Sequence, residues 1–580
     1  MSGPRGDGSS GDGRALLLAA AACVVVAFGW STFWFLTDDA FIAFRYVSNS
    51  RLGFGYTWNP PPFRPVEGYT SFLWVALLDL VWRLTGVEPP AAANPVSLVF
   101  ACGSVLVTGL AASRMELTGP LARRRLPAIA LVLIMVVTNR TFLTWTSSGL
   151  ETALYNFLTL AWLFVFLYAA DAPRRWVFAI SLLAALATLA RPEGIVFVAA
   201  TVCGIVLTGP ALIGPGASRR VTDGRALAGA SPLAIVPAHL LWRRSVYGVW
   251  LPNTWYAKTT GVWPASGLRY LLCFVIEYSL WISIVVAVLW AWRSLRARGV
   301  APLGAEARAR RLRIACAAGA FVVPFLYYTF VVGGDHFEYR VYSGLVPPVA
   351  LATFFCLDRL RWRAAAACAV LAAAAIAALP IPYTHYLATR GIWGRKETSH
   401  LVRPIAGRFP PPLSWYVSIF DRNQAWLIAR WIGVRHQEHK AFAAYMMETT
   451  PTRAQGGLIP WDGHPVAVAY SPGILAYDLP HVAFIDYLGL SDHVIARSPA
   501  IPEEPRQIAH ERRPPEGYVE CFKPNVDLAL GRVRPRLLSD DDIRACENRW
   551  WAWAAGEPLR DTSRTPGAPS AAVAISRAGS

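Results

Sequence analysis

Residues 14–36 read RALLLAAAACVVVAFGWSTFWFL, and the triplet TDD follows directly at residues 37–39. A helix that crosses the roughly 30 Å hydrocarbon core of a bilayer needs about 20 apolar residues, so this stretch predicts a membrane span. Its basic flank, Arg5 and Arg14, is also typical of a signal peptide. The apolar run continues through Trp30 and Phe35, past any small-residue cleavage site, which favours an uncleaved anchor.

The composition of the whole chain agrees with this interpretation. Of its 580 residues, 54% are hydrophobic and only 16% are charged, and the mean hydropathy is +0.36. A soluble domain carries about 25% charged residues, and a disordered chain needs low hydrophobicity, so both classes are excluded for most of the chain. We predict an α-helical polytopic membrane protein with about eleven spans, at residues 14–36, 96–112, 127–145, 151–170, 176–190, 194–210, 227–246, 267–292, 314–332, 341–357 and 364–382.

The distribution of charge predicts the orientation. Lys and Arg number 55 and Asp and Glu 37, which gives a net charge of +18. Nucleic-acid binding would explain this charge in a soluble protein, but the cytoplasmic loops of membrane proteins are also rich in Lys and Arg. We therefore expect a multi-pass plasma-membrane protein whose partner is the lipid bilayer and not nucleic acid. With the N-terminus inside, the Arg-rich loops all become cytoplasmic: 114–125, 171–175, 219–225, 293–313 and 358–363. Arg243 and Arg244, at an outer helix end, are the main exceptions.

One apolar segment is predicted not to cross the membrane. Residues 69–84, YTSFLWVALLDLVWRL, are few for a span and contain Asp79. If this segment crossed, every later loop would be inverted and the basic run 123–125 would lie outside, against the charge rule. We therefore expect a helix that lies in the membrane interface, within a long outer loop over residues 38–95.

The C-terminal part of the chain has a different character. Residues 383–580 are more polar and contain no predicted span, so after eleven spans they lie in the periplasm. Two stretches bounded by Pro and Gly, VAVAY at 466–470 and VAFIDY at 482–487, predict strands. We expect a mixed α/β or β-containing periplasmic domain over residues 383–555.

The chain ends and two cysteines complete this division. Residues 1–13, on the cytoplasmic side, and the Pro-, Ser- and Ala-rich residues 556–580 are predicted to be disordered tails. Cys521 and Cys546 are the cysteines of the predicted periplasmic domain, and an even pair in an oxidising compartment favours a disulfide. Two unpaired buried thiols are the alternative. The remaining 14–382 form the predicted transmembrane domain.

Polar residues of mixed type gather in the predicted outer loops. Helix capping explains part of this pattern, because SGLET (148–152) and RPEG (191–194) are ordinary helix starts. Capping explains TDD less well, since adjacent carboxylates repel, and it explains GGDHFEYR (333–340) least, since charges against a bilayer need partners. The outer loops therefore predict a membrane-embedded site with these candidates: Asp38, Asp39, Arg64, Glu67, Tyr69, Glu151, Arg191, Glu193, Asn253, Tyr256, Lys258, Asp335, His336, Glu338 and Arg340.

The side-chain types in these loops suit the transfer of a sugar from a phosphate. Carboxylates act as general acids, general bases or nucleophiles at a sugar carbon, and Arg and Lys bind phosphate. Aromatic residues such as Trp58 and Trp255 stack on sugars or contact lipid, although ordinary interfacial aromatics are the alternative. An outer site has no access to cytoplasmic nucleotide sugars, whereas a lipid-phosphate sugar reaches it through the bilayer.

Better-known catalytic motifs are missing from the sequence. It contains no Walker A loop, no HExxH, no CxxC pair and no GxSxG at a strand–helix turn. The HQEH run at 436–439 has near-ligand spacing, but the flanking Arg435 and Lys440 oppose a cation. We therefore predict no metal site and no cofactor, while a divalent cation between carboxylates and a lipid phosphate stays open.

The order of several motifs resembles a known group of enzymes. The acidic pair after the first span, the long outer loop and the outer C-terminal domain resemble the GT-C glycosyltransferases, which use polyprenyl-phosphate sugars. Over about residues 30–500 the chain resembles the actinobacterial terminal arabinofuranosyltransferases (AftB-like). The motifs that carry this resemblance are TDDAFIAFRY (37–46), VEGYTSFLW (66–74), SGLETALY (148–155), LARPEG (189–194), YGVWLPNTWYAK (247–258), GGDHFEYR (333–340) and FIDYLGLSDHVIA (484–496).

The resemblance implies a reaction. The donor is decaprenylphosphoryl-arabinofuranose, and the acceptor is the arabinan of arabinogalactan, with lipoarabinomannan as a further acceptor. The product gains a terminal β-(1→2)-arabinofuranose, and catalysis falls on Asp38 or Asp39. We expect the basic residues Arg191, Lys258 and Arg340 to neutralise the donor phosphate. The remaining candidates would bind sugar hydroxyls or orient the acid.

Several alternatives stay open at this stage. A β-linked donor that gives a β-linked product means net retention, which needs either a second acid, from Glu67, Asp335 or Glu338, or a front-face mechanism. The periplasmic domain is either a glycan-binding module, with Trp550, Trp551 and Trp553 as stacking residues, or a packing lid. Rival functions are a transferase of the same fold for another sugar such as mannose, a lipid-glycan transporter and a non-catalytic assembly protein. The oligomeric state is open, with a monomer as the default.

Overall fold

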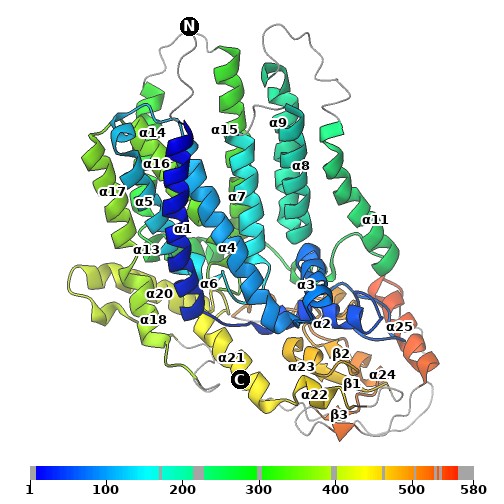
Figure 1. Cartoon of the computed structure of the whole chain (residues 1–580). Coiled ribbons are helices and arrows are strands. Elements are labelled where there is room, and N and C mark those ends of the chain that lie inside the picture. Colours follow the sequence, from blue (N-terminus) through cyan, green and yellow to red (C-terminus); the bar gives the residue numbers. More distant parts are fainter. Residues whose placement is uncertain are drawn as a thin grey trace.

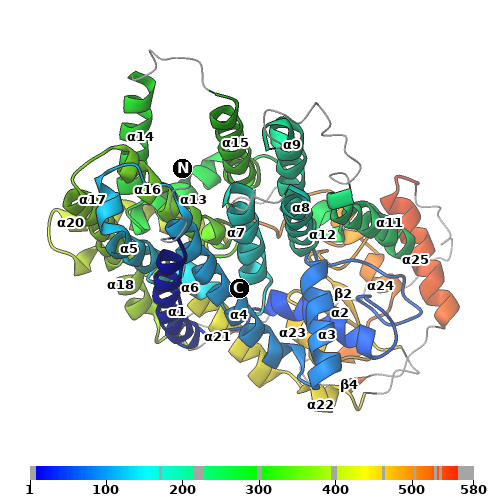
Figure 2. The same ribbon diagram turned by 45° about the horizontal axis from the view of Figure 1, so that its top comes forward.

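The protein is a bundle of helices covered at one end by the C-terminal part of the chain (Figure 1). A computed structural model describes residues 8–168, 173–212, 228–296, 304–393, 402–459, 464–501, 505–527, 532–533 and 539–558. We call the described residues from 402 to 558 the cap, and the end of the bundle that they cover the cap end. The N-terminal helix begins at the opposite end (Figures 1 and 2).

Most bundle helices overlap predicted spans, and the mostly helical architecture of a membrane protein is confirmed. Five helical stretches in the described residues are long and apolar enough to cross a bilayer, namely Asp12–Thr32, Pro89–Arg114, Ala307–Val332, Arg340–Arg359 and Ala364–Thr389. The upright helices in Figure 1 are α1 (Gly8–Thr32), α4 (Pro89–Arg114), α5 (Arg125–Val137), α7 (Thr152–Tyr168), α8 (Pro173–Ala190), α9 (Ile195–Leu212), α11 (Ile235–Tyr247), α14 (Trp281–Arg296), α15 (Ala305–Leu326), α16 (Val346–Arg359) and α17 (Ala364–Ala377).

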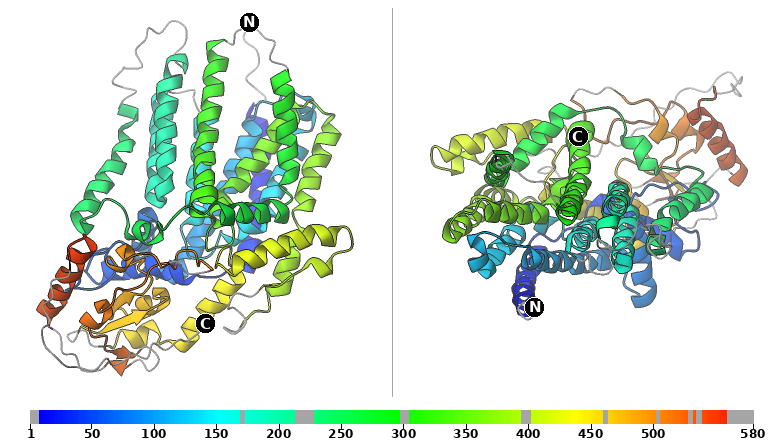
Figure 3. Two further views of the ribbon diagram at one scale, coloured as in Figure 1. Left: turned by 180° about the vertical axis from the view of Figure 1, so that it is seen from behind. Right: turned by 90° about the horizontal axis from the view of Figure 1, so that it is seen from above.

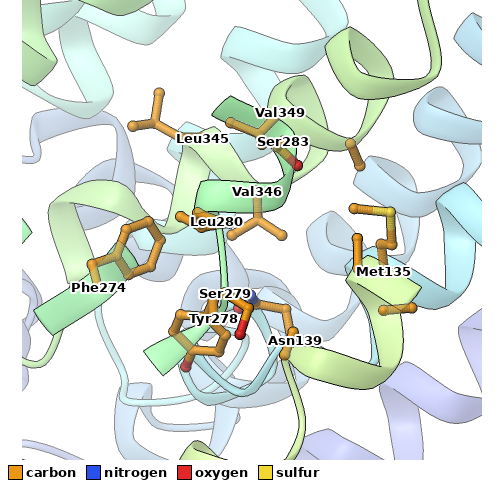
Figure 4. A pocket seen from close by; sticks show the side chains of 14 residues that line it. Met135, Asn139, Phe274, Tyr278, Ser279, Leu280, Ser283, Leu345, Val346 and Val349 are labelled. Carbon is orange, nitrogen blue, oxygen red and sulfur yellow. The ribbon is translucent and has the colours of Figure 1, made fainter. Parts of the chain in front are cut away.

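The predicted span 267–292 is not one straight helix. Helix α13 (Pro264–Glu277) lies across the bundle at the cap end, and α14 leaves it at an angle of 96° (Figure 3). The chain turns at Ser279, which has a φ of 48°. Glu277, the last residue of α13, is fully buried and paired with a cap residue, so its charge keeps α13 at the cap end. A small, mostly apolar cavity lies beside the turn (Figure 4).

The first connection, residues 33–88 between α1 and α4, forms two helices, α2 (Asp38–Arg51) and α3 (Phe72–Thr85). The sequence analysis expected no helix at α2, although Thr37 is a good helix cap. The Thr37 hydroxyl accepts a hydrogen bond from the N–H of Ala40 at 3.2 Å, and the two acids in the first turn suit the positive end of a helix. Helix α3 lies across the end of the bundle (Figure 3), and its Asp79 faces the protein, where it accepts hydrogen bonds from Ser50 and Tyr56.

The cap is a mixed helical and β structure built from short elements. Helices α18 (Pro380–Thr389) and α20 (Leu413–Ile428) lead from the bundle into α21 (His436–Thr449) and α22 (Arg453–Gly456). The two predicted strands form β1 (Val466–Ala469) and β2 (Ala483–Asp486), which pair in parallel around helix α23 (Gly473–Asp478). Helices α24 (Tyr518–Cys521) and α25 (Asp540–Ala554) are joined by the Cys521–Cys546 disulfide, and β3 (Val526–Asp527) pairs with β4 (Arg532–Val533).

Helix α2 holds the cap by both ends of α23. The Asp38 carboxylate accepts hydrogen bonds from the N–H groups of Ile474, at 2.8 Å, and Gly473, at 3.2 Å, at the start of α23. The buried Arg45 guanidinium lies further along α2 and donates to the carbonyls of Leu479, at 3.0 Å, and Val482, at 2.7 Å, beyond the end of α23. Because a helix has free N–H groups at its start and free carbonyls at its end, one acid and one base satisfy both.

A methyl group at residue 473 is expected to loosen the contact between α2 and α23. A Cβ on Gly473 would lie 2.0 Å from the Asp38 carbonyl oxygen, so Gly473→Ala forces the two backbones apart. We expect a loss of about 1–3 kcal/mol in the free energy of unfolding, seen as a lower melting temperature in detergent and faster proteolysis of the cap. Gly407→Ala is the matched control, because a Cβ there meets nothing within 4 Å. Equal stability of the two variants would contradict this contact.

Candidate functional site

Asp39 is the acid of the first connection that lacks a bonded partner. It follows Asp38 in the first turn of α2, yet it has no hydrogen bond or ion pair within the described part of the chain. Its half-buried carboxylate is close enough to act electrostatically on His336, in the 333–340 loop, and on Asp486, at the end of β2. Asp39 therefore lies where α2, the 333–340 loop and the cap meet.

Three histidines form a cluster beside Asp39. The ring of His336 lies 5.2 Å from that of His439, on α21, and 5.5 Å from that of His510. His336 Nδ1 lies 2.8 Å from the carbonyl of Trp431, and since a carbonyl only accepts, Nδ1 carries the proton and Nε2 is the free acceptor. Burial lowers the pKa of His336, although Asp39 opposes this shift, and burial lowers the pKa of His510 to about 3. The cluster is therefore neutral near pH 7 and offers hydrogen-bond acceptors.

Lys258 brings a cation to the same place. It is the last residue of α12 (Asn253–Lys258), is exposed and has no carboxylate partner among the residues described. Its charge acts on both His336 and His510. The start of α12 is fixed to the cap, because the Asn253 side-chain amide donates to the carbonyls of Gly489, Leu490 and Asp492 and its oxygen accepts from Arg497. Arg497 also lies 3.9 Å above the Tyr256 ring.

The other two predicted phosphate-binding residues, Arg191 and Arg340, already have acidic partners. Arg191 pairs with Glu151 at 2.8 Å and with Glu193 at 2.5 Å, and it donates to the Tyr328 hydroxyl at 2.9 Å. Arg340 pairs with Asp335 at 2.9 Å. The two arginines are close enough to repel each other, and Arg340 also acts on His439. This cluster of Arg191, Glu151, Glu193, Arg340 and Asp335 therefore adjoins the histidines.

The predicted residues of the first connection lie at a different contact. Glu67 forms a two-bond pair with Arg243 of α11, at 2.6 and 3.2 Å, and burial raises its pKa to about 7 against the effect of Arg243. The Tyr69 hydroxyl lies 3.1 Å from that of Tyr247. The backbone N–H of Arg64 donates to Glu547 of α25. These side chains join the first connection to α11 and to the cap, and none of their bonds is to Asp39.

Glu338 belongs to a buried network of four charges. It pairs with Arg435 of the cap at 2.5 Å and with Arg140 at 3.3 Å, and Arg435 also pairs with Glu277 at 2.9 Å. All four side chains are at most 2% exposed. The sequence analysis missed Arg140, Glu277 and Arg435. Glu277 gave one signal, because a carboxylate inside a predicted apolar span requires a partner.

The described residues include no metal centre. Among them, no group of three or more His, Cys, Asp and Glu side chains is arranged to hold a metal ion. The HQEH run lies in α21, where His436 Nδ1 faces Arg140 at 3.2 Å and His439 faces His336. These two histidines therefore point to different neighbours.

The helical bundle with an acidic pair after its first helix and a C-terminal cap has the GT-C glycosyltransferase fold, which confirms the predicted fold class. The chain is similar to the crystal structure of ArnT from Cupriavidus metallidurans bound to undecaprenyl phosphate, with 14% identity and a TM-score of 0.50, over 86% of this chain and 89% of that chain. The apo structure of the same protein gives 16% identity and a TM-score of 0.45, over 83% and 87%. No protein-family model and no curated protein matches the chain. At this identity the similarity establishes the fold alone.

The buried network is expected to hold the cap on the bundle. Arg435→Gln leaves the buried carboxylates of Glu277 and Glu338 with Arg140 as their cation, so one buried negative charge is uncompensated and we expect the free energy of unfolding to fall by about 3–5 kcal/mol. Arg310→Gln is the matched control, because Arg310 and its partner Glu116 are 41% and 66% exposed and an exposed pair contributes at most about 1 kcal/mol. Thermal unfolding of the detergent-solubilised protein measures both. Similar melting temperatures would show that the network is not needed for stability.

Proposed function

We propose that the protein is a membrane glycosyltransferase that moves arabinofuranose from a polyprenyl phosphate to a glycan. The observation that carries this proposal is the partner-free Asp39 carboxylate, next to the histidine cluster and Lys258. The GT-C fold, which is that of transferases using polyprenyl-phosphate sugars, supports the class of reaction. The choice of arabinofuranose, of arabinan as acceptor and of a β-(1→2) product rests on the sequence motifs that resemble the terminal arabinofuranosyltransferases.

The site is proposed to face the periplasm. The Arg-rich stretches 120–125, 293–296, 308–313 and 359–363 lie at or beside helix ends away from the cap, and basic segments next to membrane helices stay in the cytoplasm. The cap and Asp39 would then be on the periplasmic side of the plasma membrane. This placement suits a donor that is held in the bilayer by its lipid and an acceptor that belongs to the cell wall.

Lys258 is the proposed ligand of the donor phosphate. Arg191 and Arg340 are already neutralised by acids, so an incoming phosphate gains most from the lysine that has no carboxylate among the described residues. Trp255, 43% exposed, and Val262, 66% exposed, flank Lys258 in the sequence and offer apolar contacts for a lipid chain. The solved ArnT structure with undecaprenyl phosphate supports a lipid of this kind.

Asp39, and not Asp38, is the proposed catalytic acid. Burial raises the pKa of Asp38 to about 7, which would suit a general base, although two N–H donors oppose the shift. Both of its oxygens, however, are bonded to Gly473 and Ile474 of the cap. Adjacent residues of a helix point about 100° apart, so fixing Asp38 on α23 turns Asp39 in another direction. We infer that Asp38 positions the cap and that Asp39 meets the substrate.

The proposed step is a single displacement at the anomeric carbon. Asp39 accepts the proton of the acceptor hydroxyl as the oxygen–carbon bond forms, and the bond from the anomeric carbon to the phosphate oxygen breaks. The electron pair leaves with the lipid phosphate, whose charge Lys258 offsets. Retention through a covalent intermediate would need a second free carboxylate about 5 Å away. Glu67, Asp335 and Glu338 are each paired with arginine, so a front-face displacement is the proposal that fits.

The two acids are expected to respond differently to substitution. We expect Asp39→Asn to lower kcat about 10²–10⁴-fold, the usual contribution of a general base, with an unchanged melting temperature. Asp38→Asn keeps one oxygen that accepts a cap N–H, so we expect it to retain activity but to melt at a lower temperature. The assay is arabinose transfer from synthetic decaprenylphosphoryl-arabinofuranose to a short arabinan, with purified protein at matched amounts.

Three results would go against this assignment. An inactive Asp38→Asn together with an active Asp39→Asn would move catalysis to Asp38. Transfer of mannose but not of arabinose by the wild type would keep the enzyme class and reject the sugar. No transfer from any polyprenyl-phosphate sugar, with both variants functional in cells, would reject the enzyme.

Removal of the Lys258 charge is expected to weaken donor binding. Hydrogen bonds to charged groups are worth about 1.5–3 kcal/mol, so Lys258→Ala should raise the KM for the donor about 10- to 100-fold. Lys440→Ala, at an exposed residue of α21, is the matched control and should leave that KM unchanged. A donor KM in Lys258→Ala equal to that of the control would place the phosphate elsewhere.

A further inference from the structure

The two parallel strands of the cap end side by side in tyrosines. Tyr470 follows β1 and Tyr487 follows β2, and the last residues of the strands, Ala469 and Asp486, are paired in register. The N–H of Tyr487 donates to the carbonyl of Ala469 at 3.0 Å, which fixes the two tyrosines at equivalent positions. In open α/β sheets, ligands bind beyond the carboxyl ends of the parallel strands. The edge that carries Tyr470 and Tyr487 is therefore the edge at which a ligand is expected.

Four rings make this edge an aromatic surface, which we call the aromatic tray: Tyr487, Tyr470, His510 and Trp431. The Tyr470 ring lies 5.6 Å from that of Tyr487, at 30°, and 6.3 Å from that of His510, at 22°, so three rings are close to parallel. Trp431 meets His510 edge-on, 4.4 Å away at 74°. Tyr470 is 41% exposed, so solvent reaches the middle of the tray.

The aromatic tray continues directly into the candidate site. The ring of His510 lies 5.5 Å from that of His336, and the charge of Lys258 acts on both. At the other side, Asp39 acts on Asp486, the residue before Tyr487. The bonds from Asp38 to the start of α23, between the two strands, hold this edge in place against α2. A molecule on the tray would therefore have one end at Asp39.

We propose that the aromatic tray binds the acceptor as an uncharged oligosaccharide, with its terminal sugar at Asp39. This inference rests on the proposed function and adds to it the surface that selects the acceptor. Sugar rings present apolar C–H faces that stack on aromatic rings, while the tyrosine hydroxyls and histidine nitrogens meet the sugar hydroxyls. Each ring of the tray comes from the cap, whereas Lys258 and the arginines come from the bundle, so the proposed acceptor surface and the proposed donor residues belong to different parts of the protein.

Trp550, Trp551 and Trp553, the stacking residues of one of the two alternatives left open by the sequence, are less suited to this role. Trp550 is only 2% exposed and packs edge-on against Tyr518 and Trp553. Trp551 is stacked on His493, with ring centroids 3.7 Å apart and planes at 3°. Tyr470 also packs against Tyr487 and His510, and the Arg513 guanidinium lies 5.9 Å from its ring, but Tyr470 is 41% exposed and so leaves more ring surface for a sugar than these tryptophans do.

The test measures glycan binding separately from transfer. The full-length protein in detergent is titrated calorimetrically with a short neutral arabinan oligosaccharide in the absence of donor. We expect Tyr470→Ala to weaken binding about 3- to 10-fold, and Tyr470→Ala combined with Tyr487→Ala to weaken it further. Tyr470→Phe keeps the ring and should bind nearly as the wild type does. Trp415→Ala, at a 68% exposed cap residue outside the tray, is the matched control and should bind normally.

Transfer kinetics provide the second measurement. With the arabinan as the varied substrate, Tyr470→Ala should raise the acceptor KM by the same factor as in the titration, with the donor KM unchanged and kcat within about twofold. If Tyr470→Ala does not fold, Tyr470→Leu keeps the apolar bulk and removes the aromatic ring. Its acceptor affinity should fall in the same way.

The outcomes separate the tray from the proposed function. Unchanged oligosaccharide affinity in both Tyr470→Ala and the double variant would overturn the tray and leave the transferase intact. Weakened binding of polyprenyl phosphate instead of oligosaccharide would also overturn it, because the tray would then be a lipid site. A wild type that binds the oligosaccharide through Tyr470 but transfers no sugar from any lipid donor would support the tray as a glycan site and reject the proposed transferase.

Discussion

The hydrogen bonds from α2 to both ends of α23 fix the position of the cap on the bundle, and the rest of the cap end depends on that position. Asp38 satisfies the free N–H groups at the start of α23, and Arg45 satisfies carbonyls beyond its end. Both side chains belong to one helix that directly follows the first membrane helix, so the cap is tied to the bundle through a few residues. Helix ends leave polar groups that are costly to bury without partners. Asp38 and Arg45 of α2 supply these partners, and the fixation of Asp38 also orients Asp39.

The cost of placing charge at a membrane boundary explains why so few ionised groups of the site remain without partners. An isolated charge in a low-dielectric region is costly, and pairing or hydrogen bonding reduces that cost. Arg191, Arg340, Glu67 and Glu338 all follow this rule. Among the described residues of the site, Asp39 and Lys258 are exceptions, because neither has a bonded partner. A group that the protein leaves without a partner, among neighbours that all have one, is a group expected to find its partner in a ligand.

The sequence predicted those features that depend on local pattern. Hydropathy and the Arg-rich stretches predicted the bundle helices, and the apolar runs VAVAY and VAFIDY, bounded by Pro and Gly, predicted β1 and β2. Three features depend on distant partners and were not predictable in this way. The turn between α13 and α14 follows from the pairing of Glu277 with Arg435, which lie far apart in the chain. The fixation of Asp38 and the selection of Asp39 depend on Gly473 and Ile474, whose position no local pattern indicates.

The candidate site shows the same limit in another form. The sequence grouped its candidates by their occurrence in predicted outer loops, and the structure divides them by partner. Arg64, Glu67 and Tyr69 serve a contact between the first connection, α11 and the cap, and Glu338 serves the buried network. What remains near Asp39 is a set drawn from bundle and cap together, with Lys258 and His336 on one side and the β1 and β2 tyrosines on the other. The proposed reaction between a donor held in the lipid and an acceptor held in the cell wall needs a site of this composition, because two substrates that arrive from different phases meet only where the two parts of the protein meet.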